Sequence, residues 1–150
     1  MSKKLIIYTD GGARGNPGPA AVGVVIYNEQ NELVNKFSKF INQTTNNQAE
    51  YQAIIYALEI AKRLKSEIID FYLDSELVVQ QLNRKFKIKD KGLASLFIKI
   101  WNYSQSFKQV AFHHIPREKN KEADRLVNLI LNQIQKSKNL SKNKKDWVDR

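Results

Sequence analysis

The stretch KLIIYTDGGARGNPGPAAVGVVIY, residues 4–27, contains two strand patterns separated by a segment rich in glycine and proline. Its apolar start predicts a buried strand over residues 4–10. Residues 11–19 hold four glycines and two prolines, which predict a turn. Residues 20–27 are rich in β-branched side chains and predict a second strand. Together with a third strand expected over residues 33–40, the pattern is typical of an antiparallel meander.

The rest of the chain alternates between helical and extended patterns. Thr45, Asn46 and Asn47 offer N-caps to a helix in which alanines recur every fourth residue. From there on we expect, in chain order, a helix over residues 45–64, a strand over 67–73, helices over 75–82 and 93–101, a strand over 108–114 and a helix over 123–134. This order predicts an α/β fold whose five-stranded mixed sheet has three antiparallel strands, then two parallel ones, with helices on both faces. We expect one domain over residues 1–135 and a flexible basic tail over residues 136–150, which carries six Lys or Arg against two Asp.

Composition limits the classes of function. The net charge of +10 over 150 residues predicts attraction to a polyanion, of which nucleic acid is the commonest, although basic proteins also bind anionic membranes. The absence of cysteine excludes disulfides, zinc–thiolate sites and thiol catalysis. The chain has no signal-peptide core and no apolar run long enough to span a membrane. We therefore expect a cytoplasmic protein without a membrane partner, and a monomer.

Four acidic residues stand at the ends of the expected elements. Asp10 and Asp74 close strands, whereas Glu50 and Asp124 fall in the first turns of helices. Singly, each has an ordinary explanation, because a strand-end Asp is often a turn former and an acid at a helix start interacts favourably with the helix dipole. If the two strands are neighbours in the sheet, however, all four carboxylates converge on one place.

Such a cluster has a clear chemical consequence. Four carboxylates without matching cations repel each other, and divalent metal ions relieve that repulsion. Ligands that are all oxygen favour Mg²⁺ or Mn²⁺ over zinc. Two such ions about 4 Å apart can clamp the attacking water and the leaving oxygen of a phosphodiester. A basic protein with an acidic metal site has the electrostatic outline of a nuclease.

Four motifs occur in a fixed order along the chain: YTDGGARGNPGPAAVG (residues 8–23), TTNNQAE (44–50), LDSE (73–76) and HHIPREKNKEAD (113–124). Over about residues 4–134 the sequence resembles the type 1 ribonuclease H family. The resemblance implies a ribonuclease H-like fold and an endonuclease that hydrolyses the RNA strand of RNA–DNA hybrids. It implies Asp10, Glu50, Asp74 and Asp124 as the catalytic ligands of two Mg²⁺ or Mn²⁺ ions, the same set that the strand and helix ends indicate.

The resemblance also implies contacts with the substrate at matching positions. Asn16, Asn46 and Asn47 would approach the minor groove and the RNA 2′-hydroxyls, by which a protein distinguishes RNA from DNA. Thr45 would help to hold a phosphate of the DNA strand at the helix start. Asn120 matches a position that contacts the same region. Each has a structural alternative, since Asn16 can form a turn and the others can cap helices.

His114 lies ten residues before Asp124, the separation at which the family's catalytic histidine occurs. In the family that histidine assists proton transfer or product release, tasks that suit a side chain with a pKa near neutrality. His113 is the rival candidate. A structural or merely exposed histidine is an equally consistent interpretation.

The sequence departs from the family pattern at two places. Glu76 stands where the family often has an amide, so this acid either weakens an RNA contact or points away within its helix. The longer family members carry a basic helical insertion, for which residues 83–92, NRKFKIKDKG, are too short. Arg84, Lys85 and Lys87 in this segment form either a reduced hybrid-binding element or a solvated basic loop.

Three other classes of function remain open at this point. The first is a catalytically silent hybrid-binding module on the same fold. The second is a fragment of a related nuclease, such as a transposase, an integrase or a reverse transcriptase, or an enzyme that cuts double-stranded RNA. The third is a basic protein whose acids are merely structural.

Overall fold

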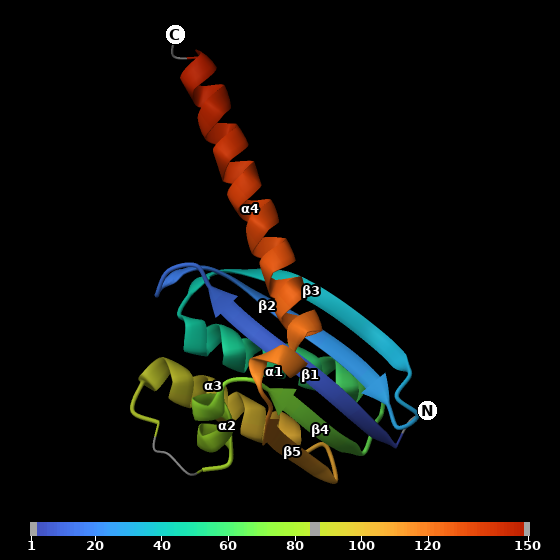
Figure 1. Ribbon diagram of the computed structural model, residues 1–150. Helices are drawn as coiled ribbons and strands as arrows, with labels where there is room; N and C mark the ends of the chain where they lie inside the picture. The colour runs from blue at the N-terminus through green and yellow to red at the C-terminus, as the bar shows by residue number, and fades with distance from the viewer. Residues whose placement is uncertain (1–2, 85–87, 149–150) are drawn as a thin grey trace.

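The computed structural model describes residues 3–84 and 88–148, with side chains described as far as Lys142. Figure 1 shows a twisted sheet with helices packed on it. The elements in chain order are β1 (Lys4–Ala13), β2 (Gly18–Asn28), β3 (Leu33–Thr44), α1 (Asn46–Arg63), β4 (Ile68–Leu73), α2 (Glu76–Leu82), α3 (Lys91–Ser104), β5 (Gln109–His114), a short 3-10 helix (Arg117–Lys119) and α4 (Lys121–Val148). In the described part of the chain, no helix is both long and apolar enough to cross a bilayer.

The sheet has the strand order β3-β2-β1-β4-β5. The β1–β2 and β2–β3 pairs are antiparallel, whereas β1–β4 and β4–β5 are parallel. On one face, buried residues of α1, α2 and α3 form the main core with alternate side chains of β1, β2 and β4. On the other face, Val127 and Leu131 of α4 pack on Ala21, and Leu126 packs on Val25. The predicted mixed sheet, covered by helices on both faces, is therefore confirmed.

The glycine-rich segment is mostly strand, contrary to the predicted turn over residues 11–19. β1 continues to Ala13 and β2 begins at Gly18, so that Gly11 pairs with Val22. The glycines serve close packing here. A Cβ atom on Gly11 would overlap the backbone of Ala49 in α1, and one on Gly23 would overlap the Ala123 carbonyl of α4. Glycine therefore allows a helix to approach the sheet closely on each face.

α1 begins where the sequence predicts, at a capping box. The Thr45 side chain accepts a hydrogen bond from the Gln48 backbone N–H at 3.2 Å, and the Gln48 side chain accepts one from the Thr45 backbone N–H. The alanines of the helix are fully buried, which brings its axis close to β1. The helix start, and with it Glu50, is thus fixed against the end of β1.

α4 extends well beyond the predicted end at residue 134, to Val148. The residues after Gln135 contain neither glycine nor proline, so the sequence holds no residue that ends a helix strongly. The apolar pattern does stop there, and the described side chains from Gln135 to Lys142 are exposed. The loss of apolar periodicity marks the end of packing on the sheet and not the end of the helix. Whether this segment is mobile stays a prediction.

Candidate active site

The four predicted acids converge at one end of the sheet. Asp10 lies in β1, and Asp74 follows β4 directly; the two strands are parallel neighbours in register at Tyr8 and Tyr72, so the two carboxylates emerge side by side. Glu50 is the fifth residue of α1, just beyond the first turn in which the sequence placed it. One carboxylate oxygen from each of Asp10, Glu50 and Asp74 lies within 4.8 Å of the other two.

Asp124 lies in the first turn of α4, as predicted. It lines the same cavity of about 400 Å³ as the other three acids, although it is not part of their tight cluster. Its carboxylate is 3.9 Å from a guanidinium nitrogen of Arg117. Gly23 makes this placement possible, because it pairs with Asp10 across β1 and β2 and contacts the α4 backbone next to Asp124.

Burial makes this cluster costly as a set of bare charges. Asp10 is 7% exposed and Glu50 is 5% exposed. Burial, followed by the charges of Asp74 and Asp124, raises the pKa of Asp10 to about 8. Burial also raises the pKa of Glu50 well above its ordinary value, with the Asp10 charge as the next cause. Oxygen Oε2 of Glu50 is buried without a hydrogen-bond partner. An unpaired buried carboxylate oxygen beside two more carboxylates fits a hard divalent cation.

Asn120 is a buried residue that forms a hydrogen bond to one acid of the cluster. Its side chain is 1% exposed, and its amide nitrogen donates to Asp74 Oδ2 at 3.1 Å and to the Thr9 carbonyl at 2.9 Å. The Asn120 side chain is enclosed and its amide nitrogen is used within the protein, whereas its Oδ1 has no hydrogen-bond partner, so the substrate contact predicted for Asn120 stays a prediction. The amide holds the Asp74 carboxylate in place.

The polar residues of the glycine-rich hairpin and of the α1 start are joined to each other. Asn16 Oδ1 accepts from the Asn46 backbone N–H, and Asn46 Oδ1 accepts from the Ala13 N–H, both at 3.1 Å. Thr45 caps α1 with its hydroxyl, as the structural alternative predicted. Asn47 is half-buried in the first turn. Of these four residues, Asn46 is the one that lines the cavity of the acids, and Asn16 is bonded to its backbone N–H. The contacts of all four with substrate remain predictions.

The two histidines differ in their surroundings. His113 stacks on Tyr72, with ring centroids 4.9 Å apart, and its Nε2 lies 3.1 Å from Asp70 Oδ1. Asp70 also pairs with Lys4 at 2.9 Å, so His113 belongs to a network on the sheet surface. His114 is exposed at the end of β5, in register with the residue that precedes Asp74. Its position favours His114 over His113 as the catalytic candidate, although His114 does not line the cavity.

The remaining predicted contacts lie further from the acids. Glu76 is exposed in the first turn of α2, accepts a hydrogen bond from Gln80 and does not line the cavity of the acids. Its effect on an RNA contact stays a prediction. The Arg84 guanidinium lies over the Trp101 ring, 3.9 Å from its centroid. Lys85 and Lys87 fall outside the described residues.

Two arginines at the site were missed by sequence reasoning. Arg14 and Arg117 line the cavity together with the acids. Arg14 lies two residues before Asn16 and Arg117 lies within the last motif, so proximity to the motifs was the available signal. Arginine forms bidentate contacts with phosphate, which makes both candidates for binding a nucleic-acid backbone.

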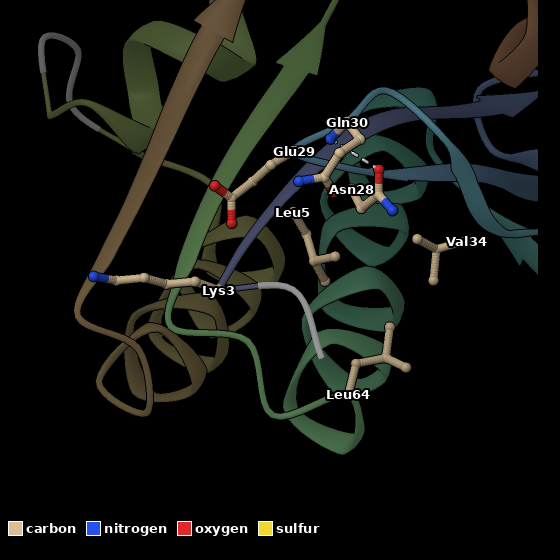
Figure 2. A pocket seen from close by; sticks show the side chains of 7 residues that line it. All are labelled: Lys3, Leu5, Asn28, Glu29, Gln30, Val34 and Leu64. Carbon is tan, nitrogen blue, oxygen red and sulfur yellow. Dashed lines mark hydrogen bonds between the residues drawn. The ribbon is translucent and has the colours of Figure 1, made fainter.

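A second cavity, of about 530 Å³, lies at the other end of β1 (Figure 2). Its walls include Leu5, Val34 and Leu64, with Lys3 and Glu29 at the edge. Among the described residues that line this second cavity, Glu29 is the single acid, so the cavity has no carboxylate cluster that could hold a metal ion. Although this cavity is larger, the chemistry of the acids lies in the smaller one.

Comparisons with known proteins agree with this geometry. The family model described as "Reverse transcriptase-like" matches residues 8–130. The chain is 37% identical over 126 residues to the bifunctional protein Rv2228c of Mycobacterium tuberculosis, covering 83% of this chain and 35% of that protein. It is 34% identical over 145 residues to the ribonuclease H of Ruthia magnifica, covering 87% and 97% of the two chains. The chain thus spans about a third of the length of the mycobacterial relatives it matches.

Solved structures show the same likeness. The RNase H1 of the archaeon Halobacterium salinarum superimposes with a TM-score of 0.84 at 37% identity, covering 87% of this chain and 98% of that one. LC11-RNase H1 in complex with an RNA/DNA hybrid gives a TM-score of 0.79 at 45% identity, with 83% and 94% covered.

Proposed function

This chain belongs to the ribonuclease H family, and from that premise we propose that it is an endonuclease that hydrolyses the RNA strand of RNA–DNA hybrids with two divalent metal ions. The observation that carries the proposal is the cluster of Asp10, Glu50 and Asp74, whose oxygens lie within 4.8 Å of one another in a protein of net charge +10. An acidic cation site inside a basic protein suits the cleavage of a polyanion.

The acids would hold the metal ions. Asp10, Glu50, Asp74 and Asp124 supply only oxygen ligands, which suit Mg²⁺ or Mn²⁺. When bound, such ions supply an activated water and stabilise the leaving oxygen of a phosphodiester. The protein's own contribution is to position these ligands: Gly11 and Gly23 allow the two helices close to Asp10, and Asn120 holds Asp74 by its amide.

Other side chains would bind the substrate and move protons. Asn46 lines the cavity and Asn16 is bonded to its backbone N–H, and the two side-chain amides would contact 2′-hydroxyls of an RNA strand. Arg14 and Arg117 line the cavity and would neutralise phosphates of the bound strand. His114, exposed beside the end of β4, would take or give a proton near the products. The hybrid present in the LC11-RNase H1 complex supports this choice of substrate.

One assay tests the proposal. Equal amounts of RNA–DNA hybrid, double-stranded RNA, double-stranded DNA and single strands are incubated with the protein, with Mg²⁺ or with excess chelator. We expect cleavage of the RNA strand of the hybrid in Mg²⁺ and none in chelator. If the protein cleaves double-stranded RNA and not the hybrid, the proposed substrate is wrong. Undiminished cleavage in chelator would refute the two-metal mechanism.

A further inference from the structure

The second half of α4 projects from the body of the protein as an isolated helix (Figure 1). We name residues 132–148 the α4 arm. The side chains of α4 that pack on the sheet, such as Val127 and Leu131, all precede it. Within the arm, the described side chains from Asn132 to Lys142 are exposed except for the half-buried Ile134. The arm therefore has a large free surface beside the site.

The face of α4 that carries Asp124 continues along the arm as a strip of amides and ammonium groups. At 3.6 residues per turn, the side chains within about 80° of the middle of this face include Asn128, Asn132, Gln135, Lys136, Asn139 and Lys142. No Asp or Glu occurs between Arg125 and Lys145. With a rise of about 1.5 Å per residue, Lys136 and Lys142 lie roughly 18 and 27 Å along the helix axis from Asp124. The strip therefore leads directly away from the acids.

Arg14 joins the base of this strip to the substrate side of the site. Its guanidinium donates to Asn132 Oδ1 at 2.6 Å and approaches Asn128 Oδ1 at 3.4 Å. The same side chain lines the cavity of the acids, and its backbone belongs to the turn that carries Asn16. The positive and amide-rich surface is thus continuous from the rim of the cavity onto the arm.

Few contacts within the protein stabilise the described part of the arm as a helix. A helix that is polar on all sides is stabilised little by burial, and like charges at positions 138 and 142 disfavour it further. An amphipathic membrane-binding helix would need a wide apolar face, whereas Ile134 and Leu140 are the only large apolar side chains between residues 132 and 142. A polyanion that pairs with the lysines and amides supplies the missing stabilisation.

We propose that the α4 arm binds the phosphate backbone of the RNA–DNA hybrid on one side of the cleavage site, along the face that carries Lys136 and Lys142. The inference rests on the proposed function, because it takes the hybrid as the ligand. It assigns to the arm additional contacts with the hybrid, in a chain whose sequence over residues 83–92 is too short for the basic helical insertion of the longer family members.

The test compares two double variants with the same change of charge. Lys136→Gln/Lys142→Gln alters the strip. Lys62→Gln/Lys65→Gln alters two exposed lysines at the C-terminal end of α1, away from the acids. Affinity for an 18-base-pair hybrid is measured in metal-free buffer at several salt concentrations. Each lost phosphate contact reduces the steepness of log affinity against log salt concentration by about 0.9. For the strip variant, which loses two contacts, the slope should therefore be less steep by about 2, and its affinity at physiological salt should be roughly 10-fold weaker. The control pair should match the parent.

Hybrid length separates a bound arm from a general effect of charge. A hybrid of 6 base pairs centred on the cleavage site should be bound equally by the strip variant and the parent, because it cannot reach Lys142. Equal slopes for the strip variant and the parent on the long hybrid would overturn the proposal, as would an equal loss in the control pair. If the parent neither binds nor cuts any hybrid, the proposed function itself fails. Melting temperatures of all three proteins should agree, since the altered side chains are exposed.

Discussion

The stability of the metal-free protein should rise when the central carboxylate of the site is neutralised. The perturbation is Asp10→Asn, which keeps the size of the side chain and removes its charge. The pKa of Asp10 is raised from 3.8 to about 8, mainly by burial and then by Asp74 and Asp124. The folded protein therefore retains a proton that the unfolded chain releases between these pH values. Folding stability of the parent is lost across that range as pH rises.

The magnitude follows from the size of the shift. Each pH unit in this window costs the parent about 1.4 kcal/mol relative to a variant with a neutral side chain at position 10. The free energy of unfolding of Asp10→Asn minus that of the parent should thus increase by about 4 kcal/mol between pH 5 and pH 8. The assay is urea unfolding of both proteins in excess chelator at the two pH values.

Asp70→Asn is the matched control, because this acid on β4 has the opposite shift. Burial works to raise the pKa of Asp70, but its hydrogen bonds to Lys4 and His113 outweigh burial and lower it. Its contribution to stability is present above the unfolded pKa and lost as pH falls, so Asp70→Asn should be the less stable protein at pH 8. An Asp10→Asn protein that is also less stable than the parent at pH 8 without metal would refute the account of the cluster as uncompensated charge.

Three further changes test the parts of the site separately. Asn120→Ala should raise the Mg²⁺ concentration needed for half-maximal cleavage by roughly 10- to 100-fold, because Asp74 loses the amide that holds it; an unchanged Mg²⁺ titration would remove that role. His114→Ala should slow turnover by roughly 10- to 10⁴-fold while the Mg²⁺ titration stays unchanged, and if His113→Ala slows turnover more, the two assignments must be exchanged. Gly11→Ala should destabilise the protein by roughly 1–3 kcal/mol or more in urea unfolding, because the added methyl group overlaps the Ala49 backbone. Gly12→Ala is the control and should be nearly neutral, because its Cβ meets Val127 at 3.4 Å. Equal losses of stability in the two variants would contradict the packing argument.

The sequence predicted those features that depend on local periodicity. The apolar run of β1, the β-branched residues of β2, and the alanine repeat and Thr45 cap of α1 specify their elements without tertiary information. The convergence of the acids also followed from strand and helix ends once β1 and β4 were taken as neighbours.

What the sequence did not predict depends on contacts between distant segments. Gly11 was read as part of a turn, because its role is set by a helix 38 residues away and not by its neighbours. The hydrogen bonds of Asn120 to Thr9 and Asp74 were not predicted, because the burial of this side chain is a tertiary property. The end of α4 was misplaced because apolar periodicity reports packing, whereas the helix continues without it.

The measurement that tests the proposed active site most directly is single-turnover cleavage of an RNA–DNA hybrid by Asp10→Asn in Mg²⁺, with hybrid affinity measured in parallel in metal-free buffer. Asp10 lies at the centre of the cluster, between Glu50 and Asp74 and within reach of the Asp124 charge. Asp10→Asn should leave the ions misplaced and cleavage nearly undetectable. Hybrid binding in metal-free buffer should be retained, and above the raised pKa of about 8, where Asp10 is ionised, it should be tighter in the variant because one charge that repels phosphate has gone. A folded Asp10→Asn protein that cuts the hybrid at the rate of the parent would contradict the assigned site.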